Sequence, residues 1–393
     1  MRKLLLASTA IAFGAGAAMA DDIKFGVLLG FTGPIESVTP HMADSAEMAW
    51  QEINEAGGIL GGQMIGSVRA DSTCLDASAA QAAAERLISS DGVVGIMGAD
   101  CSGVTMAVLQ NVAMSAGVPM ISPSATSPAF TTTDSGGMFF RTAPSDARQG
   151  AVLAEIITER GISNVAVTYT NNDYGAGFAN AFVENFEAAG GSVTTSIPHE
   201  DARGDYSAEV GTLASAGGDA LVILGYTDGG GAMLRTAWEL GAFDAFFIGD
   251  GMYGDELVES VGEALEGTVG TLPGAEGEMA DAFAALGEAN NVLTASSFTG
   301  ESYDAAALLA LAAQAAGEAT PEGIAANILN VANAPGEEIL PGELGRAIEI
   351  LANGGEVNYI GATDVELIGP GEAAGTYREY VVEDGQFVTV RFR

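Results

Sequence analysis

Apolar runs of strand length alternate with longer stretches of helical spacing along most of this chain, which constrains its fold more than any other feature. Residues 23–29 form such a run, and residues 42–56 follow with apolar side chains at helical spacing. Further strands are expected at 64–70, 93–97, 118–121, 164–169, 192–197, 220–224 and 245–249, with helices between them. This alternation predicts an α/β fold with parallel sheets covered by helices on both faces.

The strand–helix pattern runs in two series, with a restart after Arg141. A chain of 393 residues is too long for one compact core, so two Rossmann-like lobes of similar design are expected. A third section predicts helices at 279–290, 303–316 and 321–331, followed by strand-like segments at 365–369 and 377–393. Residues 305–316 are strongly apolar but too short to cross a bilayer, which favours a buried helix.

The first twenty residues have the pattern of a cleaved secretion signal. Arg2 and Lys3 precede an apolar stretch over residues 4–17, and Ala18-Met19-Ala20 forms a small-residue cleavage site before Asp21. No cysteine stands directly after the cleavage site, where a lipid would be attached. We therefore expect a soluble mature protein in the periplasm.

Charge and the rare residue types exclude several classes of function. The net charge is −38, from 52 acidic and 14 basic residues, which repels nucleic acid and anionic lipid. The two histidines, His41 and His199, show no metal-ligand spacing, so neither a metal nor a cofactor is expected. The only cysteines, Cys74 and Cys101, are expected to form a disulfide in an exported chain.

Candidate binding residues follow the predicted strands, because ligands of open parallel sheets bind at the carboxyl ends of the strands. Ser102 and Thr126 lie near predicted helix starts and suit a ligand carboxylate. Asp250 suits an ammonium group, and Tyr174 and Tyr226 offer ring faces and hydroxyls. A free amino acid would need this combination, although each residue alone also fits a helix cap or a packing role.

Four segments resemble the branched-chain amino acid (leucine/isoleucine/valine)-binding family, the type I periplasmic binding proteins of ABC transporters. They are Gly-Val-Leu-Leu-Gly-Phe-Thr-Gly-Pro at 26–34, Glu-Ile-Asn-Glu-Ala-Gly-Gly-Ile at 52–59, Met-Ile-Ser-Pro-Ser-Ala-Thr-Ser-Pro at 120–128 and Asn-Asp-Tyr-Gly at 172–175. The resemblance implies two lobes joined by three crossovers, with an amino acid held between them and a membrane permease as partner. The cysteine pair also stands where family members place a disulfide.

The resemblance assigns roles to single residues. It implies that the ligand carboxylate binds Ser102, the Ser124 backbone and Thr126, and that Asp250 takes the ammonium group where several relatives carry Glu. Tyr174 and Tyr226 match the binding aromatics. The side-chain pocket is expected to comprise residues 33–38, Phe298 and Tyr303.

Two departures from leucine-type members leave the ligand's side chain open. The first loop has no aromatic residue, and Gly300 stands where a bulky residue occurs in relatives. Glu36 in the first loop favours a polar or cationic side chain, unless it is simply a solvated loop charge.

The expected lobe boundaries give residues 21–142 and 272–350 to the first lobe, and residues 143–271 and 351–393 to the second. Short crossovers suffice to join them, since no low-complexity linker is present.

The sequence also bears on other functions that a chain of this fold could have. Residues 249–254 match G-x-G-x-x-G, but a tight turn below a helix accounts for them as well as a dinucleotide site does. Catalytic motifs such as G-x-S-x-G and H-E-x-x-H are absent from the sequence, so an enzyme is not expected, although Asp228 and Asp250 are a conceivable carboxylate pair. Binding of a small amide or urea, and a receptor that senses rather than transports, remain alternatives.

Overall fold

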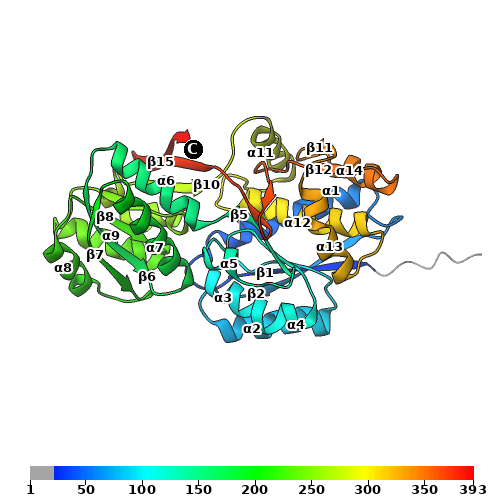
Figure 1. Ribbon diagram of the computed structural model, residues 1–393, viewed down its shortest axis with the longest axis horizontal. Coiled ribbons are helices and arrows are strands. Elements are labelled where there is room, and N and C mark those ends of the chain that lie inside the picture. Colours follow the sequence, from blue (N-terminus) through cyan, green and yellow to red (C-terminus); the bar gives the residue numbers. More distant parts are fainter. Residues whose placement is uncertain (1–21) are drawn as a thin grey trace, which may run out of the picture.

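Two α/β lobes lie side by side in the computed structural model, which describes residues 22–393 (Figure 1). The predicted signal peptide lies outside the described residues. Each lobe is built on one seven-stranded sheet, and the strands within the central part of each sheet pair in parallel. The predicted fold class is therefore confirmed.

The first sheet has the strand order β13-β14-β5-β4-β3-β1-β2. Its strands are β1 (Ile23–Leu29), β2 (Ile65–Asp71), β3 (Ile96–Gly98), β4 (Met120–Ser122), β5 (Phe139–Pro144), β13 (Leu367–Ile368) and β14 (Glu372–Ala373). Its helices are α1 (Thr39–Glu55), α2 (Ala77–Arg86), α3 (Ser102–Val108), α4 (Met114–Ala116), α5 (Ala129–Thr132), α11 (Glu278–Asn290), α12 (Thr299–Ala316), α13 (Pro321–Ala332) and α14 (Leu344–Ala352). A short parallel pair, β11 (Glu337–Ile339) and β12 (Val357–Tyr359), completes this lobe.

The second sheet has the order β16-β15-β10-β9-β8-β6-β7. Its strands are β6 (Asn164–Thr170), β7 (Ser192–His199), β8 (Ala220–Leu224), β9 (Phe246–Ile248), β10 (Val269–Pro273), β15 (Tyr377–Glu383) and β16 (Gln386–Phe392). Its helices are α6 (Asp146–Glu159), α7 (Asp173–Ala188), α8 (Ser207–Ala216), α9 (Thr227–Glu239) and α10 (Asp255–Val261). The last two strands form an antiparallel hairpin over residues that were expected to be strand-like.

The chain crosses between the lobes three times, as the family resemblance implied. The crossovers run from β5 to α6, from β10 to α11 and from β14 to β15. In Figure 1 these segments meet in the middle of the molecule. Three parallel paths through one region make a hinge that permits rotation of the lobes while keeping them in register.

The strand pairing differs from the expected lobe boundary at residue 351. Strand β14 pairs with β5 of the first sheet, β13 pairs with β14, and β12 pairs with β11. Local sequence pattern identified residues 365–369 as extended but carries no information on which sheet they join. We propose that the last crossover, near residue 374, is the boundary instead.

Helix α12 is the central helix of the first lobe and is buried on all sides over most of its length. Side chains of α1 fasten it, since the Trp50 Nε1–H donates to the Ala306 carbonyl at 2.9 Å and the Ser45 hydroxyl to the Thr299 carbonyl at 2.7 Å. The predicted buried helix is thus confirmed. Within residues 22–393, no helix has both the length and the apolar character that a bilayer span requires.

Candidate functional site

A cavity of about 530 Å³ lies between the lobes, at the carboxyl ends of strands from both sheets. The first lobe contributes polar and apolar walls: Ile35, Ser37, Val38, Met42, Asp100, Cys101, Ser102, Ser124, Ser297 and Phe298. The second contributes aromatic and acidic groups: Tyr174, Tyr226, Thr227, Asp250, Gly251 and Tyr253. Six residues predicted from the sequence meet on these walls, namely Ser102, Ser124, Tyr174, Tyr226, Asp250 and Phe298.

The hydroxyl wall of the first lobe is built at the start of α3. Ser102 is buried, and its Oγ accepts a hydrogen bond from the Ser127 backbone N–H at 3.1 Å. Its own proton therefore stays available for an acceptor in the cavity. The Ser124 hydroxyl donates to the Asp100 carbonyl at 3.2 Å. The arrangement presents hydroxyl groups to the cavity from two adjacent loops.

The predicted Thr126 and Tyr303 do not line the cavity. Thr126 is fully buried, and its carbonyl accepts a hydrogen bond at 2.9 Å from the backbone N–H of Asp146, at the start of α6. The Tyr303 hydroxyl donates to Glu52 Oε2 of α1 at 2.6 Å, so its ring belongs to the core of the first lobe. Both residues matched family positions, but both are buried off the cavity wall.

Arg141 is a positioning residue that the sequence interpretation missed. Its side chain is fully buried, and Nη1 donates to the carbonyls of Ala125 and Ser127 at 3.0 and 2.9 Å. The Nη2 group pairs with Glu372 of β14. This guanidinium therefore fixes the loop that carries Ser124.

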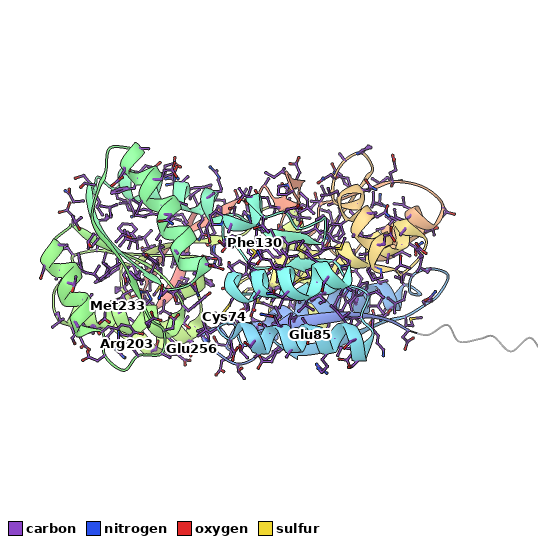
Figure 2. The ribbon with its side chains drawn as sticks, turned by 60° about the horizontal axis from the view of Figure 1, so that its bottom comes forward. Cys74, Glu85, Phe130, Arg203, Met233 and Glu256 are labelled. Carbon is purple, nitrogen blue, oxygen red and sulfur yellow. A yellow bond between two sulfur atoms is a disulfide. The ribbon has the colours of Figure 1, made fainter. Side chains whose placement is uncertain are left out.

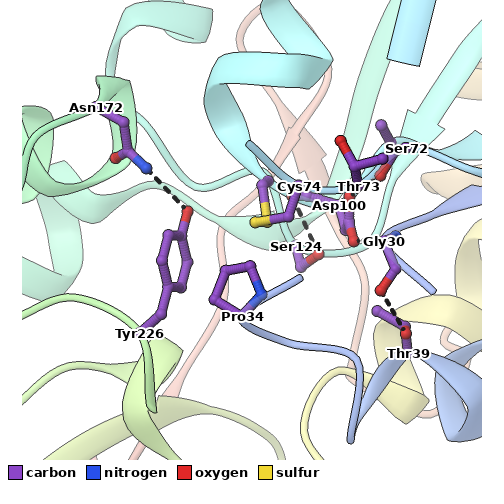
Figure 3. The surroundings of a disulfide bond; sticks show 12 residues. Gly30, Pro34, Thr39, Ser72, Thr73, Cys74, Asp100, Ser124, Asn172 and Tyr226 are labelled. Atoms are coloured by element: carbon purple, nitrogen blue, oxygen red, sulfur yellow. Dashed lines mark hydrogen bonds between the residues drawn. A yellow bond between two sulfur atoms is a disulfide. The ribbon is translucent and has the colours of Figure 1, made fainter. Parts of the chain in front are cut away.

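A disulfide between Cys74 and Cys101 braces the same wall, as predicted. Figure 2 places Cys74 at the junction of the lobes, and Figure 3 shows the hydrogen bonds around the bridge. Asp100, next to Cys101, accepts from the Gly30 N–H at 2.6 Å and the Ser72 hydroxyl at 2.7 Å. The loops that follow β1, β2 and β3 are thus joined immediately before Ser102.

Two stacked tyrosines form the facing wall of the second lobe. The rings of Tyr174 and Tyr226 lie 5.3 Å apart between centroids at an interplanar angle of 23°. The Asn172 amide donates to the Tyr226 hydroxyl at 3.3 Å (Figure 3). The Thr227 hydroxyl reaches across the lobes to the Pro34 carbonyl at 3.0 Å. These rings give a flat, largely apolar surface with hydroxyl groups at its edge.

Asp250 is the acid that the second lobe contributes to the cavity wall, and it is only 3% exposed. The Tyr174 hydroxyl donates to its Oδ1 at 2.8 Å, and the Gln149 amide donates to the same oxygen at 3.2 Å. Burial raises the pKa of Asp250 to about 6, while the hydrogen bonds from Tyr174 and Gln149 oppose the rise. Both side-chain donors use Oδ1, so Oδ2 is the oxygen best placed to meet a cationic ligand group.

A second buried acid, Asp146, stands near Asp250 and was also missed. Its side chain is fully buried, and neither carboxylate oxygen has a hydrogen-bond partner among residues 22–393. Burial, and then the negative charge of Asp250, raise the pKa of Asp146 well above its usual range. Asp250 has donors and Asp146 has none, so Asp250 is the group that ionises first.

Recognising β5 as a strand would have pointed to Arg141, which lies within it, and to Asp146 and Gln149, which follow it. All three lie in or just after β5, which the sequence interpretation did not recognise as a strand. Without this strand, the polar residues after it did not stand out as candidate ligand contacts.

The glycines around Asp250 serve packing. A Cβ on Gly249 would lie 2.7 Å from Phe178 Cε1, and one on Gly251 would lie 2.7 Å from the Gly225 carbonyl oxygen. The G-x-G pattern thus lets the Asp250 turn approach the neighbouring helix and strand end. Asp228, the other member of the conceivable carboxylate pair, does not line the cavity; the acid next to Asp250 is Asp146.

The remaining wall of the cavity is apolar. Ile35, Val38 and Met42 come from the first loop and α1, and Phe298 precedes α12. Glu36 is exposed and is not part of the wall, as expected for a solvated loop charge. In the described part of the chain, no cluster of three or more His, Cys, Asp or Glu side chains is arranged to hold a metal ion.

Comparison with known proteins identifies the family of this chain. The family model described as periplasmic binding protein matches residues 22–346. A leucine-, isoleucine-, valine-, threonine- and alanine-binding protein of Pseudomonas aeruginosa is 33% identical over 330 residues, covering 82% of this chain and 86% of the relative.

Solved structures show the same fold. A leucine-binding protein of Thermotoga maritima superposes with a TM-score of 0.80 at 24% identity, covering 94% of this chain and 98% of that one. A branched-chain amino acid transporter substrate-binding protein of Streptococcus pneumoniae in complex with isoleucine gives 0.78 at 23% identity, covering 94% and 99%. This chain belongs to the periplasmic binding protein family, in the group of leucine/isoleucine/valine-binding proteins.

Proposed function

We propose that this protein captures a free α-amino acid with an aliphatic side chain in the periplasm and delivers it to the permease of an ABC importer. The observation that carries the proposal is a single cavity that combines hydroxyls of one lobe, a buried acid of the other and an apolar end. A zwitterionic head group and a hydrocarbon side chain need these three environments together. The relatives' names, which include leucine, isoleucine and valine, support the same ligand class.

The hydroxyl groups and charges of the cavity walls decide how we orient the ligand's carboxylate and ammonium groups. The carboxylate faces the first lobe, where the Ser102 hydroxyl has a free proton and Ser124 lies alongside. The ammonium group faces Asp250 Oδ2, a charge-assisted contact in a site shielded from water.

The side chain is assigned from the apolar wall. Ile35, Val38, Met42 and Phe298 are the aliphatic and phenyl side chains on the first-lobe wall of the cavity. A branched aliphatic side chain would bury its surface there at about 25 cal/mol per Å². A charged side-chain end would lose its hydration with no partner on this wall.

Delivery follows from the position of the site between the lobes. A ligand that contacts Ser102 on one side and Asp250 on the other binds the closed arrangement better than an open one, and this difference drives closure. We propose that the permease recognises the closed form.

Calorimetry of the purified mature protein against the common amino acids, small amides and urea tests the proposal. We expect saturable binding of leucine, isoleucine or valine and no binding of arginine or glutamate. Binding of urea or amides alone would contradict the head-group assignment, and the absence of any amino-acid ligand would contradict the function.

The variant Asp250→Asn isolates the ammonium contact. It keeps the shape of the side chain but removes the charge, so affinity should fall by about 2–4 kcal/mol, the scale of a lost charged hydrogen bond in a buried site. Asp228→Asn, which changes an acid of the same lobe outside the cavity, is the matched control and should bind normally. Equal affinity of Asp250→Asn and the wild type would refute this role.

A further inference from the structure

A second cavity lies behind the amino-acid cavity, at the hinge between the lobes. It encloses about 730 Å³ and is bounded by the β10 crossover, α11, the first turn of α12 and the C-terminal strands, including Pro273, Ala280, Phe283, Gly300, Ala362 and Phe392. We call it the hinge cavity. Most of its walls are small or apolar, with Glu301 and Arg378 as the charged groups.

Phe298 is the residue that separates the two cavities. It lies on the wall of both, and no other described residue does so. Its side chain is 9% exposed, so the ring fills the space between them. The hydrocarbon end of a ligand held by Asp250 and Ser102 would therefore meet this ring.

The backbone holds Phe298 firmly in place. Its φ is 57°, a left-handed conformation that is unusual for a large residue. The carbonyl of Phe298 accepts from the Ser302 N–H at 3.0 Å and from the Ser302 hydroxyl at 2.7 Å. The Ser297 hydroxyl donates to the Tyr253 carbonyl of the second lobe at 3.2 Å. These hydrogen bonds fix the backbone on both sides of Phe298, so we expect its ring to keep one position between the two cavities.

Small residues explain why the hinge cavity is open. Gly300 lines it, and a Cβ at this position would lie 2.9 Å from Thr363 Cγ2. Ala280 and Ala284 line it from α11. Removing the Phe298 ring would therefore join this space to the amino-acid cavity, because the residue lies on both walls.

We propose that Phe298 sets the upper limit on the length of the ligand's side chain, and that the hinge cavity is a latent subsite for longer apolar side chains. This inference rests on the proposed binding of an aliphatic amino acid. In the wild type, side chains up to the size of leucine fit before the ring. Longer unbranched chains are excluded by the ring, not by a lack of space beyond it.

The test uses a straight-chain series of amino acids, from norvaline to 2-aminooctanoate, measured by calorimetry. For the wild type, affinity should drop beyond norleucine. For Phe298→Ala, 2-aminooctanoate should gain at least about tenfold, because two further methylene groups enter apolar surroundings. Phe298→Gly, whose backbone accepts the observed φ, replaces the Ala variant if that one does not fold.

A double variant shows whether the hinge cavity is the space that is used. Ala280→Leu narrows this cavity from α11 and, combined with Phe298→Ala, should remove the gain for 2-aminooctanoate. Ala285→Leu, on the same helix but outside the cavity, is the matched control and should leave the gain intact.

The outcomes are separable. If the wild type binds leucine but Phe298→Ala gives no gain for long chains, or if Ala280→Leu leaves the gain unchanged, the inference is wrong while the proposed function stands. If the wild type binds no amino acid in the series, the proposed function itself fails.

Discussion

The two buried carboxylates near the cavity differ in what surrounds them. Asp250 has two side-chain donors on one oxygen, whereas Asp146 has no hydrogen-bond partner within residues 22–393. Two neighbouring buried acids do not both ionise easily, so the donors decide which one carries the charge. On the second-lobe side of the cavity, Asp250 is thus the acid that we expect to carry the charge opposite the ammonium group.

The raised pKa of Asp250 predicts a pH dependence of ligand affinity. The ammonium group needs the carboxylate form, and the pKa of Asp250 in the free protein is about 6. Affinity should be constant from about pH 7 to 8 and should fall by up to about tenfold per unit below pH 6, as protonation competes with the ligand. Calorimetry of leucine binding between pH 4.5 and 8 measures this slope.

The control for this prediction is Asp228→Asn, which leaves the cavity acid in place and should show the same pH profile as the wild type. A flat profile down to pH 4.5 in the wild type would mean that Asp250 stays ionised without the ligand.

Sequence position alone located the residues that follow recognisable strands. Ser102, Tyr226 and Asp250 each come directly after a strand that the apolar pattern identified, and all line the cavity. Thr126 is fully buried and is not on the cavity wall, which the sequence does not reveal. Asp146 was missed because its strand was missed.

At the scale of elements, the first turn of α12 contacts a crossover that forms part of the hinge. Glu301 lies there, 4% exposed, on the wall of the hinge cavity. Its backbone carbonyl accepts from the Thr142 hydroxyl of the β5 crossover at 2.7 Å. Burial raises the pKa of Glu301 to about 8, with smaller contributions from Asp304 and Asp250, while Arg378 opposes the rise.

This shift predicts that Glu301 destabilises the protein as pH rises. Between the unfolded pKa of 4.5 and the folded pKa of about 8, the native state binds more protons than the unfolded state, so stability falls with increasing pH. The variant Glu301→Gln has no ionisable group at this position, so it lacks this pH-dependent loss of stability. Relative to the wild type, it should gain stability progressively from about pH 4.5 to 8, by up to roughly 5 kcal/mol.

Urea denaturation at several pH values measures the difference. Glu278→Gln, an exposed acid in the first turn of α11, is the control and should show little change. A pH-independent difference between Glu301→Gln and the wild type would show that Glu301 is ionised in the fold.

Elements with strong periodicity were predictable, and short ones were not. The hairpin of β15 and β16 and the buried α12 follow from local pattern, since apolar spacing and a Gly turn define them. Strand β14 has two residues and owes its conformation to β5 beside it. Its membership in the first sheet depends on tertiary pairing, which no local pattern encodes.

For the whole molecule, the crossovers and the shared cavity predict that ligand binding changes the overall shape. The ligand joins Ser102 and Asp250 across the gap, so saturating leucine should shift the population towards the closed arrangement. Small-angle X-ray scattering should show a smaller radius of gyration with leucine than without it.

Asp250→Asn at the same leucine concentration should scatter like the free protein, because it lacks the contact that joins the lobes. An unchanged radius for the wild type under saturating leucine would mean that closure is not coupled to binding.

The bridge between Cys74 and Cys101 has a consequence for when the cavity becomes complete. Cys101 is part of the cavity wall, and the next residue supplies the hydroxyl assigned to the carboxylate. Such bonds form where thiols are oxidised and not in the reducing cytosol. Under the proposed export to the periplasm, a chain still in the cytosol would lack this covalent brace beside Ser102, and we expect it to hold its ligand more weakly than the oxidised protein does.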